Sequence, residues 1–180
     1  GLRVHLDGAR LFNASVALEC PPSALTKEVD TVGFCLSKSL CCPIGSVLCG
    51  DTEFIREANR WRKALGGGMR QVGIVAAAGI VALDTMIDRL ADDHANARKL
   101  AGGLAEIRGI RIDPETVQTN IVRFGVPKGA GGKIAAGLKE EGVYINPGDS
   151  DLRMVTHYWV SSADIEFTLK AMRKVMVAVR

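Results

Sequence analysis

The chain has 180 residues, of which 47% are hydrophobic and 24% charged, as in a folded globular protein of one domain or a domain and a half. The net charge of +3 and an aromatic content of 5% do not favour nucleic acid as a partner. The apolar run at residues 72–83 is too short to span a bilayer, so we expect no membrane-spanning segment.

The five cysteines favour a reducing compartment. Their number is odd, and Cys41 and Cys42 are adjacent, which does not suit a disulfide framework. We therefore expect a cytoplasmic location, or a mitochondrial one in a eukaryote. The spacing of Cys and His does not favour a metal site, so we expect none. The first residue is Gly1 and the chain begins inside an expected strand, so we expect a fragment whose targeting segment would lie outside it.

The first part of the chain alternates strands and helices. Apolar runs and turn residues predict strands at residues 3–6, 31–36 and 46–49, and helices at residues 9–18, 51–65, 71–83 and 87–104. Asp51 is expected to cap the second of these helices. The helix at residues 71–83 is apolar almost all round, so we expect it to be buried in a large core or a subunit interface.

A break at Asp113 and Pro114 precedes a smaller unit. We place the domain boundary near residue 110, giving domains at residues 1–110 and 111–180. The second domain is predicted to be α+β, with strands at residues 119–124, 143–146 and 152–156 and helices at residues 133–141 and from Ser161 onward. Ser161 and Asp164 have the spacing of a capping box. The fold class of the whole chain is predicted to be α/β.

Lys38 and Asp7 are the residues that most suggest chemistry. Lys38 follows a buried strand among small, turn-forming residues, where we expect surroundings that exclude water. Desolvation makes a lysine amine a usable nucleophile, and its best-known use is a Schiff base with pyridoxal 5′-phosphate (PLP). Asp7 ends another expected strand 31 residues earlier. Since α/β folds bind ligands at the carboxyl ends of strands, the pair would hold opposite ends of PLP. Taken singly, Lys38 is more simply a loop lysine and Asp7 a helix cap.

Three arginines are further candidates for binding anions. Arg10 lies one helical turn after Asp7, where it would clamp a carboxylate or pair with Asp7 itself. Arg70 follows a glycine loop that enters a helix, an arrangement that suits a phosphate, although the loop also reads as a plain connector. Arg153 lies in an otherwise apolar strand, and its partner would be a substrate carboxylate or a structural acid.

Four ordered segments resemble motifs of the low-specificity L-threonine aldolase family of β-eliminating lyases. Residues 5–13 resemble its pyridinium-aspartate motif, and residues 37–47 its PLP-lysine motif. Residues 61–71 are similar to its glycine segment and residues 152–157 to a late strand, so the resemblance spans nearly the whole chain. It implies the C-terminal part of a fold-type-I PLP-enzyme large domain followed by a small α+β domain, in a homodimer or homotetramer.

The resemblance also implies an activity and residue roles. The enzyme would be a PLP-dependent carbon–carbon lyase that cleaves L-threonine or L-allo-threonine to glycine and acetaldehyde, in threonine catabolism and glycine formation. By motif match, Lys38 is catalytic and bonds PLP, and Asp7 holds its ring nitrogen. Arg70 approaches the phosphate in a neighbouring subunit's site, and Arg10 and Arg153 bind the substrate carboxylate. Family members are about twice this length, so the chain alone is expected to carry half a site.

Two alternatives remain at this point. One is another PLP-dependent lyase acting on β-hydroxy or β-substituted amino acids. The other is a truncated, catalytically incomplete homologue. It is suggested by the expected missing half and by Cys41 and Cys42, at positions where the family has glycine or alanine. A separate departure is Tyr158 and Trp159 after His157, where the family usually has an aspartate.

Overall fold

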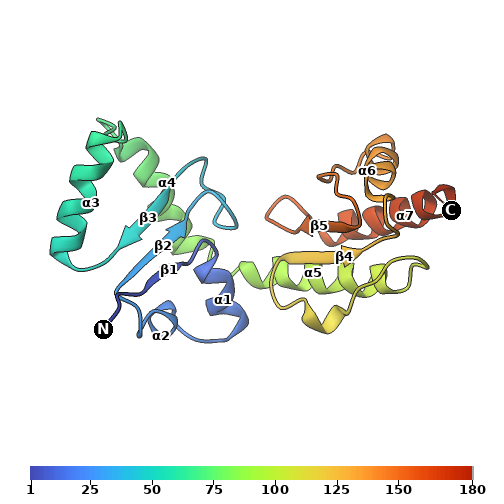
Figure 1. Ribbon diagram of the computed structural model, residues 1–180, viewed down its shortest axis with the longest axis horizontal. Helices are drawn as coiled ribbons and strands as arrows, with labels where there is room; N and C mark the ends of the chain where they lie inside the picture. The colour runs from blue at the N-terminus through green and yellow to red at the C-terminus, as the bar shows by residue number, and fades with distance from the viewer. Residues whose placement is uncertain (180) are drawn as a thin grey trace. The chain divides into compact units, whose positions relative to one another are not determined.

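The computed structural model describes residues 1–179 and divides into two compact units, Gly1–Leu90 and Ala91–Arg180 (Figure 1). The sequence analysis placed the boundary near residue 110. The division falls earlier because helix α5 (Leu90–Ala105) contributes Leu100 and Leu104 to the core of the second unit. Within residues 1–179, no helix combines the length and the hydrophobicity needed to cross a bilayer.

A three-stranded sheet forms the centre of the first unit. Strand β2 (Thr31–Cys35) lies between β1 (His5–Asp7), which is parallel to it, and β3 (Ser46–Cys49), which is antiparallel. One face of the sheet packs on α1 (Leu11–Ala17), with Phe12 and Phe34 in an edge-to-face contact at 5.2 Å. The buried core on this side consists of Leu11, Phe34, Leu36, Leu40, Cys42, Ala82 and Leu90.

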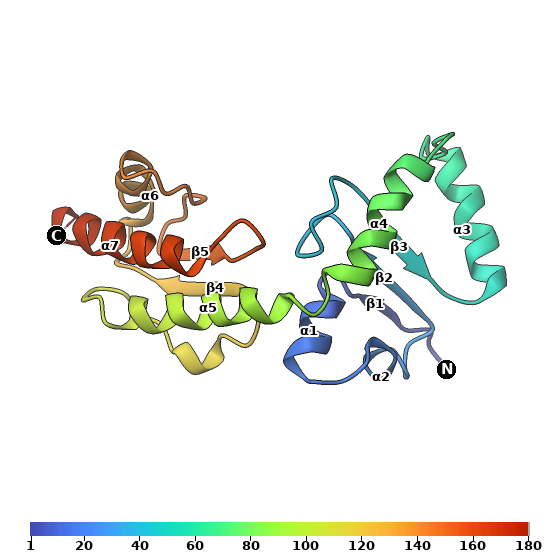
Figure 2. The same cartoon turned by 180° about the vertical axis from the view of Figure 1, so that it is seen from behind.

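The remaining helices of the first unit are α2 (Pro22–Leu25), α3 (Thr52–Ala64) and α4 (Gly73–Thr85). The predicted cap of α3 is confirmed, because an Asp51 carboxylate oxygen accepts the Phe54 N–H at 2.7 Å. Helices α3 and α4 meet at the end remote from the sheet (Figure 2). The turn between them contains Gly66 with φ +86°, a left-handed conformation that glycine adopts without strain.

Helix α4 is apolar, as the sequence shows, but most of its surface is exposed. Only Gly79 and Ala82 are buried, whereas Ile74 is 85% and Ile80 63% exposed. One strip of the helix meets the sheet core, and no other element of this unit covers the remainder. The expected burial is therefore not provided by the described residues of this chain.

The second unit packs three helices on a two-stranded antiparallel sheet of β4 (Ile121–Gly125) and β5 (Asp151–Val155). Alternate strand residues enter its core with side chains of α5, α6 (Gly131–Glu140) and α7 (Ser162–Ala178). A short 3₁₀ helix, η1 (Pro114–Thr116), precedes β4. The fully buried sheet residues are Val122, Phe124 and Leu152, with Met154 7% exposed.

The strand predicted at residues 143–146 is not formed. The Val143 N–H donates to the Leu138 carbonyl at 2.8 Å, and Gly142 has φ +84°. This arrangement closes the C-terminal end of α6 and takes the Val143 amide away from any strand ladder. Val143 and Ile145 still pack against the core, which explains the strand-like pattern of the sequence.

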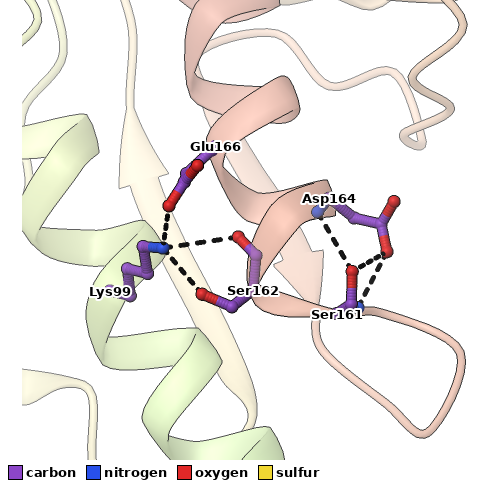
Figure 3. Close-up of polar contacts among 5 residues, drawn as sticks. All are labelled: Lys99, Ser161, Ser162, Asp164 and Glu166. Atoms are coloured by element: carbon purple, nitrogen blue, oxygen red, sulfur yellow. Dashed lines mark hydrogen bonds and ion pairs between the residues drawn. The ribbon is translucent and has the colours of Figure 1, made fainter.

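The start of α7 shows the predicted capping box (Figure 3). The Ser161 hydroxyl accepts the Asp164 N–H at 3.2 Å, and the Asp164 carboxylate accepts the Ser161 N–H at 2.8 Å. On α5, the Lys99 ammonium donates to the Ser162 hydroxyl at 2.7 Å and to the Glu166 carboxylate. Hydrogen bonds from Ser161 lower the pKa of Asp164, and the Lys99 ammonium lowers the pKa of Glu166. These contacts join α5 to α7.

Candidate active site

Asp7 lies at the carboxyl edge of the first unit's sheet. It pairs in register with Gly33 of the parallel strand β2. The chain then turns sharply, because the Gly8 N–H donates to the Gly33 carbonyl at 2.8 Å and the Asp7 carboxylate accepts the Ala9 N–H at 3.2 Å. A Cβ on Gly8 would lie 3.1 Å from both the Gly33 oxygen and a Val32 methyl. Glycine therefore lets the turn after Asp7 lie directly on β2.

Lys38 lies in the loop that follows β2, at the same edge of the sheet. Its carbonyl accepts the Cys41 N–H at 2.9 Å, and Cys41 adopts a φ of +61° in this turn. The loop buries Ser39 and Leu40 but leaves the Lys38 side chain exposed. The water-poor surroundings that we expected for Lys38 are thus not formed by the described residues.

The segments that carry Asp7 and Lys38 contact each other. The Cys35 N–H donates to the Ala9 carbonyl at 3.4 Å. Arg10 is half-buried and lines a small cavity of about 10 Å³ together with Cys35 and Ser39. The structure therefore brings the two predicted motifs to one place, with Arg10 between them.

A larger cavity of about 640 Å³ lies beside Asp7, on the sheet face that α3 covers. The sheet lines it with the small residues Gly33, Cys35 and Ser46 and with the larger Phe34, Val47 and Leu48. Its lining includes Asp7 but does not include Lys38, so the two side chains are not arranged around this cavity together.

Helix α3 places Asn59 and Arg62 on the opposite wall of this cavity. The sequence analysis did not single out either residue. Helical spacing could have found Arg62, because it follows Ile55 and Ala58, which line the same cavity, by seven and four positions. Arg62 brings a positive charge to a cavity that Asp7 borders.

Arg70 lies outside both cavities of the first unit described here. It is exposed in the turn before α4, next to Gln71, which has φ +48°. The glycine segment is exposed throughout residues 61–73. Arg70 therefore lies just before the apolar helix α4, and no other residue of the first unit forms an anion-binding site with it.

Arg153 belongs to the second unit, on the exposed face of β5. The opposite residue in the register is Arg123, which forms an ion pair with Asp151 at 3.3 Å. Among residues 1–179, Arg153 itself takes part in no ion pair. It borders a cavity of about 550 Å³ that is lined largely by apolar side chains, with Asn146 and His157 among the polar ones.

The cysteines near the lysine loop are all free thiols. Cys42 is buried, and its thiol donates to the Ala78 carbonyl at 3.4 Å. Burial, and to a smaller extent the neighbouring Cys41, raises the pKa of Cys42, so this thiol stays protonated near neutral pH. Cys42 packs the lysine loop against α4 and supplies no nucleophile.

The family model of beta-eliminating lyases matches residues 1–126, a stretch that includes Asp7, Lys38 and the glycine segment. The chain belongs to the beta-eliminating lyase family. This family match covers the whole first unit and continues into β4 of the second.

Relatives within the beta-eliminating lyases carry one recurrent name. The chain is 40% identical over 184 residues to low-specificity L-threonine aldolase 1 of Arabidopsis thaliana, with 100% of this chain and 51% of the relative covered. It is 43% identical over 160 residues to low specificity L-threonine aldolase of Escherichia coli (strain K12), with 89% and 47% covered. The chain therefore spans about half the length of these relatives.

Solved structures agree on the fold of this beta-eliminating lyase chain. A protein from Listeria monocytogenes EGD-E superposes with a TM-score of 0.79 at 21% identity, over 97% of this chain and 52% of that one. The cysteine desulfurase CsdA of Escherichia coli superposes with a TM-score of 0.73 at 17% identity, over 99% and 52%. The fold is the α/β fold of fold-type-I PLP enzymes, again over about half of each neighbour.

Proposed function

We propose that this chain is part of a PLP-dependent L-threonine aldolase, a carbon–carbon lyase that converts L-threonine or L-allo-threonine to glycine and acetaldehyde. The observation that carries the proposal is the 40% identity along the entire chain to a low-specificity L-threonine aldolase. The meeting of the Asp7 and Lys38 segments at one sheet edge supports it independently. Such an enzyme would serve threonine catabolism and glycine formation.

Two groups at this edge of the sheet suit PLP. Asp7 supplies an acid at the end of β1, and the exposed Lys38 supplies an amine in the loop after β2, on segments that contact each other. Asp7 would hold the ring nitrogen protonated, and Lys38, in the adjacent loop, would bond the aldehyde carbon. When bound, the cofactor supplies an electron sink for the electron pair released when the bond between Cα and Cβ breaks.

The proposed substrate-binding groups are Arg10 and Arg153. A guanidinium group binds a carboxylate through two parallel hydrogen bonds, which fixes the orientation of an amino acid as well as its position. Arg10 borders the cavity between the two motifs. Arg153 remains outside the ion pairs of residues 1–179 because Asp151 is paired with Arg123. Holding the carboxylate leaves the Cα–Cβ bond free to be oriented for cleavage.

We further propose a homodimer or homotetramer in the cytoplasm. The exposed apolar surface of α4, which includes Ile74, Ile80 and Val81, is of the kind that a second copy covers. Arg70 precedes this helix, so a subunit contact there would present it to a neighbouring subunit's cofactor phosphate. Five free cysteines are consistent with a reducing compartment.

The cofactor proposal is tested by adding PLP to the full-length protein and recording its absorbance near the visible edge. We expect a bound-cofactor band in the wild type, its loss in Lys38→Ala and its retention in Lys63→Ala, a matched change of an exposed lysine on α3. A band that survives in Lys38→Ala would show that another residue bonds the cofactor.

The reaction is tested by its products from L-threonine. Glycine and acetaldehyde support the aldolase, whereas ammonia and a keto acid would replace it with another PLP-dependent lyase of β-substituted amino acids. A full-length wild-type protein that neither binds PLP nor turns over L-threonine would instead be the catalytically incomplete homologue.

A further inference from the structure

The end of β5 is fixed by Thr156, a polar residue that is only 1% exposed. Its hydroxyl donates to the Asp93 carbonyl of α5 at 2.6 Å. Its N–H donates to the Asn120 carbonyl at 3.0 Å, and its own carbonyl accepts the Asn120 side-chain amide at 2.9 Å. Every polar group of Thr156 is therefore used, and the hydroxyl is the group that reaches α5.

The turn after Thr156 is anchored to α5 a second time. The Asn96 side-chain amide donates to the Val160 carbonyl at 2.9 Å, and the Val160 N–H closes the turn on the His157 carbonyl at 2.8 Å. Asp93 and Asn96 are three positions apart on α5 and so lie on one face of the helix. Helix α5 thus holds both ends of the segment at residues 156–160.

These anchors matter because β5 is bonded to another strand on one side only. The sheet has two strands, and the other side of β5 borders the cavity of about 550 Å³. A strand with a single ladder is less firmly located than one bonded on both sides. Arg153 projects from this strand three residues before Thr156, so a shift at the end of β5 moves its guanidinium group.

We propose that Thr156 is a positioning residue for substrate binding. Through its hydroxyl bond to α5 it locates the end of β5 and thereby the guanidinium group of Arg153. The inference rests on the proposed role of Arg153 in binding the substrate carboxylate. Thr156 touches no substrate in this account, and its effect is expected on affinity rather than on the chemical step.

The test is an NMR titration of the 180-residue chain with glycine, a small amino acid carboxylate, read at the Arg153 Nε–H signal. Thr156→Val keeps the branched shape but removes the hydroxyl, and we expect it to weaken glycine binding by up to about five-fold, the limit set by a hydrogen bond of about 1 kcal/mol that favours the binding arrangement. Thr156→Ser keeps the hydroxyl and is expected to bind glycine within about two-fold of the wild type.

Thr116→Val is the matched control. It removes the same kind of bond, from a threonine hydroxyl to the Asp113 carbonyl at 2.7 Å, in η1 of the same unit. We expect unchanged glycine binding in this variant. A second readout is the amide exchange of Met154, whose neighbours in the ladder lie on β4. Thr156→Val should speed this exchange and Thr116→Val should not.

Wild-type glycine affinity in Thr156→Val would overturn the inference, and so would equal weakening in both valine variants, which would indicate general destabilisation. If Thr156→Val does not fold, Asn96→Leu is used in its place, since it removes the second bond from α5, to the Val160 carbonyl. Its glycine affinity is then compared with that of Thr116→Val in the same way. Failure of the proposed function is recognised separately by titrating Arg153→Gln and following the signals of glycine itself, because this variant would then bind glycine as well as the wild type does.

Discussion

Gly131 at the start of α6 occupies a site where even a methyl group does not fit. A Cβ placed there would lie 2.0 Å from the Gly148 oxygen and 2.7 Å from the Asp149 oxygen. Both are backbone atoms of the turn before β5, and the Gly131 N–H donates to the Asp149 oxygen at 2.9 Å. Relief therefore requires α6 and this turn to separate, which breaks the hydrogen bond and loosens the packing of Ile134 and Leu138.

We expect Gly131→Ala to lower the free energy of unfolding by about 2–4 kcal/mol, the sum of an overpacking term of about 1–3 kcal/mol and a lost hydrogen bond of about 1 kcal/mol. With a urea m-value of about 1–2 kcal/mol/M, the unfolding midpoint should fall by at least about 1 M. Far-UV circular dichroism measures the midpoint, and the amide signal of Val122, which is fully buried in this unit, assigns the transition.

Gly132 provides the control on the same helix. A Cβ there meets nothing within 4 Å, so Gly132→Ala should raise stability by about 0.5–1 kcal/mol through helix propensity alone. Equal midpoints for Gly131→Ala and Gly132→Ala would refute the close approach of α6 to the turn at residues 148–149.

Three further predictions follow from burial, capping and exposure. Burial, and to a smaller extent the nearby Arg98, lowers the pKa of His94 in the folded chain. Because the unfolded chain then binds a proton more readily than the folded one, the free energy of unfolding should fall as pH drops below about 6.5. Urea midpoints at pH 7 and 5.5 should differ less in His94→Gln than in the wild type. Ser161→Ala should cost about 1 kcal/mol by removing the cap of α7, and a thermal scan without a lower midpoint would contradict this. Ile80→Lys should shift the chain to monomers in sedimentation without unfolding it, because Ile80 is exposed, whereas Glu57→Lys on α3 should not.

Local sequence signals predicted much of the fold. Asp51 and Ser161 cap their helices as expected because the partner of each lies three residues away, and no distant contact is needed to form the bond. The strands around Asp7 and Lys38 were likewise found, because each is a short, largely apolar run bounded by turn residues.

Features that depend on distant partners were not predictable in this way. The pattern at residues 143–146 reflects packing of Val143 and Ile145 on the core, and the same alternation serves a strand or an irregular segment. The apolar composition of α4 does not reveal what covers it. The exposure of Lys38 was not predictable for the same reason, because the residues that surround a lysine at a strand end can come from any part of a fold. Arg62 shares a helical face with Ile55 and Ala58, but the sequence does not show that this face of α3 borders a cavity.

The chain contains two tryptophans, and each unit holds one of them. Trp61 on α3 is 62% exposed, and Trp159 in the turn after β5 is 78% exposed. Fluorescence quenching by iodide therefore begins from two water-exposed indoles whose emission is red-shifted. In Trp159→Phe, Trp61 is the remaining indole, and its shielding from iodide would rise with protein concentration if chains associate at α3 and α4. In Trp61→Phe, the remaining Trp159 would instead report ligand binding or structural change beside β5.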